Sequence, residues 1–499
     1  MFRMRSFAAA PVIATLLGGT AHAALTADQV WQSWKAAGAL VGLTVSAATE
    51  NNSGGVLTLN GVTIAPQGMS GLTISDMVLT EQSDGSVTIT PGADIGMTMT
   101  GDTEGSVKVT HDGLTLTARE ANGGLAYDYA AARLDVAYDS TYPGMSFDGS
   151  EAPKVAASGD FGFSNLAGTY SDTPGTNRTF GLTIKSDELA YTTQSDDPGM
   201  ELKQTSTSTT QNIDLSMSFA LPTTIALAAM QSPADFATAL NEGLSLSLSM
   251  TQGESVGKMK QESPYVPMDL TMKAGGGEGS ALFNKDSFSV KSSASGLDIE
   301  SAPGAMPVPV KVVSGPMEFA MTSPVIANEA AGDYGLVLKL SQFSLNEEAW
   351  ALFDPNGALK RDAADIAIDI SGKTKMDVPA MIAADEAGTA PVVPQPESLN
   401  ITELGVKVAG AALAATGAFT FDNSMGMPMP LGEANVSVTG ANALIDGLIA
   451  TGLITNEDAM GARMMMGMFM IPNGNDSLTS KIEAKEGMQI LVNGQPLPM

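Results

Sequence analysis

The sequence predicts a mainly β protein: long antiparallel meandering sheets, as a sandwich or a curved groove, with a few short helices. Apolar residues alternate with Thr, Ser and Asp along most of the chain, as in the run from Leu244 to Met250. Such a period of two is typical of a strand with one apolar face. Turn signals such as Ser83-Asp84-Gly85, His111-Asp112-Gly113 and Asn122-Gly123-Gly124 separate these runs, and helical periodicity is rare. We therefore expect hairpins that follow one another along the chain.

The alternating runs occur in both halves of the chain, and each predicts one strand. Nine of these runs, in chain order, show the pattern clearly. They are Leu57-Thr58-Leu59, Val62-Thr63-Ile64, Val87-Thr88-Ile89, Val107-Lys108-Val109, Ile213 to Phe219, Leu336 to Leu340, Ile366 to Ile370, Val436-Ser437-Val438 and Ile490 to Val492.

Helical signals are few and local. Thr26 is a good N-cap for a short helix that places Trp31 and Trp34 on one face. Residues 222–242 predict a helical stretch broken near Pro233, and Glu347 to Phe353 a shorter helix. A helical pair is expected over 442–451 and 455–470, where Thr455 and Asp458 form a capping box with Asp in the usual Glu position.

Composition indicates two loops and the division of the chain into parts. Residues 193–212 are rich in Thr, Ser and Gln, and residues 385–398 in Pro, Ala and Glu, so both are expected to be flexible loops. We expect a signal peptide over residues 1–23 and a division near residue 220. This gives a β-rich half over 24–220 and a second β-rich half over 221–499 that includes the helices of 442–470.

The first residues predict export. Arg3 and Arg5 precede an apolar run from Ala8 to Gly19, and Ala21-His22-Ala23 forms a cleavage motif. This order is typical of a secretory signal peptide cut between Ala23 and Ala24. We expect a periplasmic protein. No apolar run of about 18 residues follows, so no transmembrane span is expected in the mature chain.

Composition excludes several function classes. The formal net charge of −29 opposes binding to nucleic acid and to anionic lipid surfaces. Cys is absent, and the chain has two His residues, of which only His111 lies beyond the signal. A zinc site of several His or Cys is therefore excluded.

His111 in Thr110-His111-Asp112-Gly113 fits a hairpin turn better than a general base. No phosphate loop, calcium loop or nucleophile elbow occurs. We expect no enzyme and no cofactor.

Methionine is unusually frequent, with 30 residues. Met460, Met464 and Met468 lie four residues apart on one predicted helix face. The thioether sulfurs of such residues could bind Cu(I). Flexible apolar packing or recognition explains these Met residues better. With Leu246, Leu248 and Met250 on an alternating strand, these three Met residues are our candidates for contact with an apolar ligand.

The predicted strands have more apolar surface than the predicted helices can cover, and the functional hypotheses follow from this. The many half-apolar strands need a cover, and the few helices cannot supply it. The sheet could close on itself as a sandwich, which favours a structural or protein-interaction role in the envelope. It could instead curl into a groove that takes up lipid or another apolar ligand. The groove is the leading hypothesis, and an enzyme with a cleft of acidic residues is a third.

Short motifs connect the chain to a known family. They are Val30-Trp31-Gln32-Ser33-Trp34, the run from Leu352 to Leu359, the helix from Leu444 to Leu453, Ala462-Arg463-Met464-Met465, Asp476-Ser477-Leu478 and the run from Val492 to Leu497. Together they resemble the exported alphaproteobacterial proteins grouped as domain of unknown function 2125. That resemblance implies an envelope-associated protein without assigned activity, and it carries over no site residues. In strand style alone the chain is also similar to envelope proteins of the AsmA type, which are regarded as lipid-handling β-grooves. Because the signal peptide is expected to be cleaved, we expect no counterpart of their membrane anchor.

Overall fold

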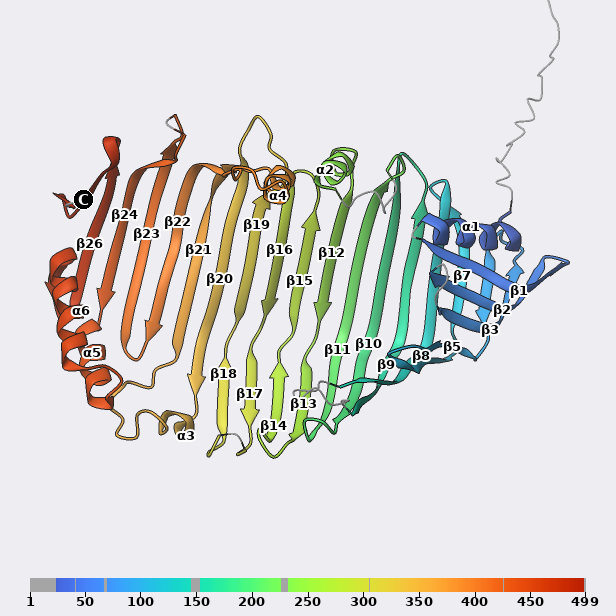
Figure 1. Cartoon of the computed structure of the whole chain (residues 1–499), viewed down its shortest axis with the longest axis horizontal. Coiled ribbons are helices and arrows are strands. Elements are labelled where there is room, and N and C mark those ends of the chain that lie inside the picture. The colour runs from blue at the N-terminus through green and yellow to red at the C-terminus, as the bar shows by residue number, and fades with distance from the viewer. Residues whose placement is uncertain are drawn as a thin grey trace, which may run out of the picture.

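The computed structural model describes residues 24–40, 42–66, 70–144, 153–225, 232–304, 306–424 and 426–497. Residues 1–23, which hold the predicted signal and Ala23, lie outside this range, and Ala24 is the first described residue. All strands of the described chain belong to one sheet, and every pairing is antiparallel. The mainly β prediction is confirmed, and its form is a single long sheet rather than two packed sheets (Figure 1).

The N-terminal part of the sheet contains eleven strands and one helix. They are α1 (Ala27–Leu40), β1 (Leu43–Ser53), β2 (Val56–Pro66), β3 (Leu72–Glu81), β4 (Val87–Pro91), β5 (Ile95–Met99), β6 (Glu104–Asp112), β7 (Thr115–Ala121), β8 (Gly124–Pro143), β9 (Lys154–Thr173), β10 (Asn177–Asp197) and β11 (Leu202–Pro222).

The remaining elements continue the same meander. They are α2 (Pro233–Asn241), β12 (Ser245–Gln252), β13 (Ser255–Glu262), β14 (Met268–Ala274), β15 (Gly277–Phe283), β16 (Ser287–Ala294), β17 (Leu297–Ser301), β18 (Val310–Ser314), β19 (Met317–Pro324), β20 (Gly332–Leu345), α3 (Glu347–Trp350), β21 (Ala364–Lys375), α4 (Val378–Glu386), β22 (Gln395–Val408), β23 (Ala411–Asp422), β24 (Met429–Thr439), α5 (Ala441–Thr451), α6 (Asn456–Phe469), β25 (Ile471–Gly474), β26 (Ser477–Lys485), a short 3₁₀ turn (Glu486–Met488), β27 (Gln489–Val492) and β28 (Gln495–Pro496).

Several rows of the sheet consist of two short strands placed end to end. β11 pairs with β13 along its first half and with β12 along its second half, and these two partners are consecutive in the chain. The same arrangement joins β14 to β15, β16 to β17 and β18 to β19, and earlier β4 to β5 and β6 to β7. Each such pair is one strand of the meander with a break in its middle.

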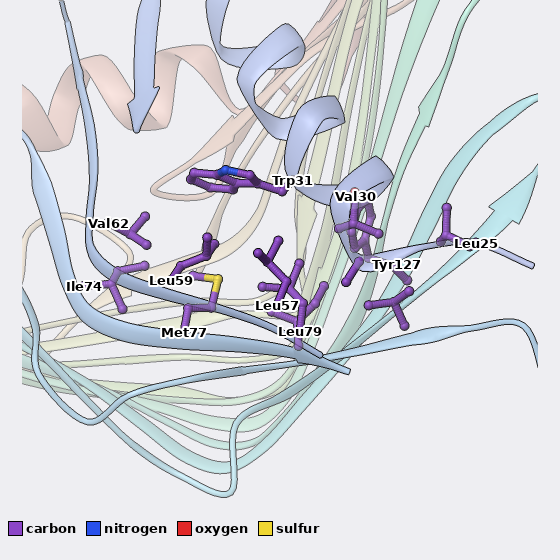
Figure 2. Packing of buried hydrophobic residues seen from close by; sticks show 14 of the residues in the cluster. Leu25, Val30, Trp31, Leu57, Leu59, Val62, Ile74, Met77, Leu79 and Tyr127 are labelled. Carbon is purple, nitrogen blue, oxygen red and sulfur yellow. The ribbon is translucent and has the colours of Figure 1, made fainter. Parts of the chain in front are cut away.

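These breaks line up across the sheet. Some strands are not broken, but they contain a non-glycine residue with left-handed backbone at the level of the breaks. Examples are Asn165 (φ 49°) in β9, Asn212 (φ 50°) in β11 and Gln342 (φ 54°) in β20. Gly253 donates its N–H to the carbonyl oxygen of Gln211 at 2.7 Å, which connects the break after β12 to that in β11. We call this line the crease. Irregular residues of this kind bend strands, and the ribbons below the buried residues Leu57, Leu59 and Leu79 are bent in Figure 2.

Strand register gives the sheet two different faces. One cross-strand row on what we call the apolar face runs through Tyr127, Tyr170, Leu182, Met217, Leu248, Ala281, Val290, Met321, Leu336, Ile370, Ile401, Gly417, Ala434, Ile482 and Val492. The neighbouring row on the other face, called the polar face, runs through Asp128, Thr169, Thr183, Ser216, Ser249, Ser280 and Lys291. The alternation predicted from sequence is therefore sorted consistently onto two faces.

Most expected helices are present. α1 begins after Thr26, whose hydroxyl accepts the Gln29 N–H at 3.2 Å, and α3, α5 and α6 lie where the pattern predicts them. The Thr455–Asp458 capping box is confirmed. In the stretch 222–242, Pro222 ends β11, residues 226–231 lie outside the described range, and the helix begins at Pro233. α4 was not predicted from the sequence.

Two local predictions are wrong. Residues 193–212 are not a flexible loop, because they form the ends of β10 and β11, joined by a short turn and paired from Asp197↔Leu202 onward. Their β-branched Thr residues have high strand propensity, and pairing with the neighbouring strands outweighs the lack of an apolar face. His111-Asp112-Gly113 is a break within one row rather than a hairpin turn, since β6 and β7 both pair with β8. The loop predicted over residues 385–398 is shorter in the structure. Residues 387–394 connect α4 to β22, and the other residues of the predicted loop belong to these two elements.

Residue 220 lies inside the continuous sheet. Ala220 of β11 pairs with Ser245 of β12, and β11 also pairs with β10 along its whole length. The division of the chain into two halves near residue 220 stays a prediction.

Candidate apolar-ligand site

The apolar face is covered by a helix at its N-terminal end. Val30 and Trp31 of α1 are fully buried against Leu57, Leu59 and Leu79 of β2 and β3 (Figure 2). The burial of several large side chains at about 1.5–3 kcal/mol each anchors α1 to the sheet. This helix therefore closes the first rows of the apolar face.

A second cover lies at one rim in the middle of the sheet. Phe236, Ala239 and Leu240 of α2 pack with Leu221, Phe283, Phe288 and Val325, which come from β11, β15, β16 and the position directly after β19. α4 lies beside α2, and the Val378 N–H donates to the Val325 carbonyl oxygen at 2.8 Å. Figure 1 shows both helices at the same edge of the sheet. In the described part of the chain, the other helices that closely approach strands are α3, at β18, and α5, at β23; the apolar rows away from these places and from α1 are called the uncovered rows.

The uncovered rows expose large apolar side chains. Leu246, Phe319, Leu338 and Ile366 are 37–39% exposed, and all four lie on the apolar face. Met321, Val406 and Leu413 on the same face are exposed to a similar extent. Contiguous apolar surface of this length is uncommon on proteins without a partner or ligand.

A hollow of about 410 Å³ lies on this face beside α4. Met321, Leu336 and Ile370 from three adjacent strands form its floor, and Met376 and Pro394 come from the two segments that flank α4. At its edge Tyr334 donates its hydroxyl to the Ser398 carbonyl oxygen at 3.0 Å, and burial raises the pKa of Tyr334. The hollow is almost wholly apolar and can take a hydrocarbon segment.

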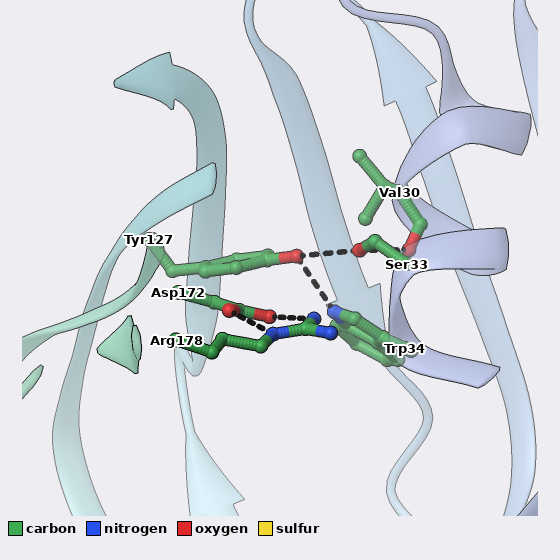
Figure 3. A network of polar contacts seen from close by, with 6 residues as sticks. All are labelled: Val30, Ser33, Trp34, Tyr127, Asp172 and Arg178. Atoms are coloured by element: carbon green, nitrogen blue, oxygen red, sulfur yellow. Dashed lines mark hydrogen bonds and ion pairs between the residues drawn. The ribbon is translucent and has the colours of Figure 1, made fainter. Parts of the chain in front are cut away.

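A polar network borders the region that α1 covers (Figure 3). Trp34 Nε1 donates to the Tyr127 hydroxyl at 2.9 Å, and Ser33 Oγ lies 3.3 Å from the same oxygen. Arg178 donates from Nε and Nη2 to the two carboxylate oxygens of Asp172, at 2.7 and 2.5 Å. Burial, and then the negative charge of Asp172, raises the pKa of Tyr170 to about 12. These tyrosines stay neutral at physiological pH.

The predicted ligand residues fall into two separate groups. Leu246, Leu248 and Met250 lie together on the apolar face of β12, opposite Phe219, Met217 and Leu215 of β11. Met460, Met464 and Met468 are 63–67% exposed on α6 at the C-terminal end of the sheet, away from β12 (Figure 1). The sequence did not single out the hollow, because its lining residues come from four separate segments. The alternation in β19 to β21 was the only available signal.

His111 lies on the apolar face next to the crease, and its Nε2 is 3.3 Å from the Gly92 carbonyl oxygen. No group of three or more His, Asp or Glu residues in the described part of the chain is arranged to hold a metal ion. None of the described helices is both long enough and apolar enough to cross a bilayer.

The short motifs near the end of the chain build the C-terminal end of the sheet. Asp354 is fully buried and accepts the backbone N–H groups of Ala358 and Leu359 at 2.8 and 3.0 Å. A Cβ on Gly447 of α5 would lie 2.8 Å from Leu359, so this approach requires glycine. Arg463 of α6 donates to Asp446 of α5 at 2.6 Å. These residues position helices and form no reactive cluster.

A family model described as "Uncharacterized protein conserved in bacteria (DUF2125)" matches residues 189–491. No curated protein matches the chain.

Proposed function

The chain belongs to the uncharacterised bacterial family DUF2125, and on this premise we propose that it is a non-enzymatic protein that binds lipid acyl chains along its apolar face. We also propose that it is exported to the periplasm, which the basic and apolar character of residues 1–23 supports. The observation that carries the proposal is the apolar row from Tyr170 to Ile482, which contains no charged side chain and whose members are mostly half-buried, with exposed Leu246, Phe319 and Leu338 in the rows beside it on the same face.

The geometry favours acyl chains over other apolar ligands. The rows run across the strands, and at ~4.8 Å per strand the row from β9 to β26 extends on the order of 60 Å. A flexible hydrocarbon can follow such a row, and each buried CH₂ contributes about 0.8 kcal/mol. The hollow beside α4 provides one deeper place along it.

A protein partner is a second candidate, and a separate observation favours it. Met460, Met464, Met465 and Met468 of α6 are 59–67% exposed on a helix that packs against α5 and is hydrogen-bonded at its end, through the Phe469 carbonyl oxygen, to Ser480 and Asn493. Adaptable Met side chains suit the recognition of varied apolar partners. This surface lies at the end of the sheet, so both roles can coexist.

Two adjacent residues of β20 allow a matched test. Leu338 faces the apolar side, opposite Phe319 and Ile368, whereas Val337 faces the polar side, opposite Ala320 and Asp369. Leu338→Lys places an ammonium group in the path of the hydrocarbon, which is costly to desolvate. We expect it to weaken binding of palmitate or a lysophospholipid about tenfold or more, equivalent to ~1.4 kcal/mol.

Val337→Lys is the control, and we expect it to retain wild-type affinity. Binding is measured by isothermal titration, and native mass spectrometry of protein purified from its host should show adducts of lipid mass. The proposal is wrong if the wild type carries no lipid and binds neither probe. Equal loss in both variants would also contradict it, because the binding would then not depend on the apolar face.

A further inference from the structure

The outer face of α6 carries thioether sulfurs that lipid binding along the sheet does not use. Met460, Met464, Met465 and Met468 are 59–67% exposed, and Figure 1 shows α6 at the outer end of the sheet. Met usually fills gaps in a core, and the sequence alone favours packing or apolar recognition for these residues. Their exposure excludes packing within this chain, so the sulfurs require another explanation.

Three of the sulfurs can converge on one ion. Met468 follows Met464 by four residues and Met465 by three, so it is a neighbour of both on the helix surface. The side chain of Met has three rotatable bonds, which allows each sulfur to reach a shared point above the helix. Met460 lies one turn before Met464 and can supply a fourth sulfur.

The residues beside these sulfurs are small. Gly461 precedes Met464 and Met465 by three and four residues, and Gly467 is adjacent to Met468. A Cβ on either glycine would have no atom within 4 Å, so packing does not require glycine at these positions. Glycine is unfavourable inside a helix. Here it leaves the space next to the thioethers open.

The charges of α6 suit a cation on this face. Arg463 is the one basic residue of the helix, and it donates to Asp446 and Asn442 of α5 at 2.6 and 3.1 Å. Glu457 is exposed and lies three residues before Met460, on the side that carries the sulfurs. The guanidinium is therefore directed towards α5, while a carboxylate lies near the sulfurs.

Both ends of α6 are fixed, so the helix can hold its donors in place. The Thr455–Asp458 capping box closes the start. At the end, the Phe469 carbonyl oxygen accepts hydrogen bonds from Ser480 and Asn493 at 2.7 and 2.9 Å.

The donor set selects among metal ions. Thioether sulfur is a soft ligand that suits Cu(I), whereas Zn²⁺ takes Cys, His and carboxylate, and Ca²⁺ and Mg²⁺ take oxygen ligands. The chain has no Cys, and in the residues that the structure describes no three His, Asp or Glu are grouped to hold a metal. A site of thioethers alone therefore favours Cu(I).

We infer that Met464, Met465 and Met468 bind one Cu(I) ion through their three thioether sulfurs. Each sulfur donates a lone pair, and copper stays in the Cu(I) state. No proton is released, because a thioether has none to lose. The inference does not depend on the proposed lipid binding, since α6 lies away from the uncovered rows.

The test titrates Cu(I) into the purified protein, under ascorbate and without oxygen, in competition with a chromogenic Cu(I) chelator. We expect one tightly bound ion per chain. The variant Met464→Leu/Met465→Leu/Met468→Leu, called the Leu variant, keeps the apolar volume and the helix propensity but removes the sulfurs. Its affinity for Cu(I) should be lower by about tenfold or more, equivalent to ~1.4 kcal/mol.

The control removes three exposed sulfurs that come from separate segments. Met200, Met306 and Met488 are 40%, 44% and 57% exposed, and Met200→Leu/Met306→Leu/Met488→Leu should keep the wild-type affinity. An equal loss in the control and the Leu variant would contradict a site on α6, because any exposed Met would then serve.

Two further measurements examine the ligands themselves. X-ray absorption at the copper edge should show sulfur neighbours in the wild type, and nitrogen or oxygen neighbours alone would overturn the inference. Affinity at about pH 5.5 should stay within about twofold of that at pH 7, since binding does not compete with protonation of the ligands. A steep loss at the lower pH would indicate carboxylate ligands instead.

The Leu variant also separates Cu(I) binding from apolar recognition. If the wild type binds no Cu(I), or the Leu variant binds it equally well, the inference is wrong and recognition of a protein partner remains for this face. Circular dichroism checks that the Leu variant folds. If it does not, Met468→Leu alone replaces it, and we expect that change to weaken Cu(I) binding at least threefold, or ~0.65 kcal/mol.

Discussion

Asp476 connects two distant parts of the chain through its carboxylate. Its Oδ1 accepts the N–H of Asn442 at 3.1 Å and its Oδ2 accepts the N–H of Ala443 at 3.1 Å. These are free donors at the start of α5, where the N-cap Gly440 has no side chain to accept them. A residue 34 positions away thus serves as the cap, which explains its place in the terminal motif.

The pKa of Asp476 has a consequence for stability. Burial acts to raise this pKa, but the hydrogen bonds from Ala443 and Asn442 outweigh it and lower the pKa. A carboxyl with a lowered pKa in the folded state stabilises the fold above its ordinary pKa, and this contribution is lost as the pH falls through the folded-state value.

We expect Asp476→Ala to reduce the free energy of unfolding by about 1–2 kcal/mol at pH 7, because two helix N–H groups lose their acceptor. The difference from the wild type should shrink as the pH falls below about 4, the ordinary pKa of Asp, and should vanish below the lower folded-state pKa, where the carboxyl of the folded wild type becomes protonated. Urea unfolding at both pH values measures it. Asp102→Ala, at an exposed position before β6, is the control, and an equal effect of both changes would contradict the capping role.

At the scale of the element, the crease depends on residues that accept left-handed backbone. Asn212 has φ 50° and interrupts the pairing of β11 between Gln211 and Ile213. Asn tolerates this conformation, whereas β-branched residues do not. Because the break in β11 meets that at Gly253, a change here affects two neighbouring strands.

Asn212→Val should lower the free energy of unfolding by about 1–2 kcal/mol, since the left-handed region is costly for a β-branched residue. Asn212→Gly should remain within about 0.5 kcal/mol of the wild type, because glycine adopts this backbone freely. Chemical denaturation of the two variants measures the difference. Equal stabilities would show that the break in β11 does not require positive φ.

At the scale of the whole molecule, each strand contacts only its neighbours in the sheet. The residues in closest contact belong to directly paired strands such as β8 and β9 or β21 and β22. Such a molecule resembles a repeat protein in its energetics, where stability is the sum of neighbouring interfaces. Two places differ: the N-terminal end, where α1 joins several strands into one buried cluster, and the rim where α2 packs against residues of several strands.

We therefore expect local stability to vary along the sheet. Amide hydrogen exchange should be slowest in β2 to β4, where Leu59, Leu79 and Val87 are fully buried. Exchange should be faster in β12 to β15, where no helix covers much of the apolar face. A lipid that binds this face should slow exchange there and leave β2 to β4 unchanged. Uniform protection along the sheet would contradict this view.

The sequence by itself determined the local character of most elements. Alternation in Leu244 to Met250 or Leu336 to Leu340 predicted both the strand and which residues share a face, because the strand period is fixed by backbone geometry. Caps such as Thr26 and Thr455 gave the helix starts for the same reason. Composition was misleading in residues 193–212, where Thr and Ser lie on both faces of the strands, and turn chemistry was misleading at His111-Asp112-Gly113, which is a break within one row.

Only the tertiary structure decided how these strands combine. A pattern within one strand does not contain its register with the next strand, and it is register that aligns Leu182, Met217 and Leu248 into one row. The same holds for the Asp172–Arg178 pair and the hollow beside α4, whose residues come from separate elements. One open sheet with an uncovered apolar face, rather than a sandwich, therefore emerges from pairing between strands.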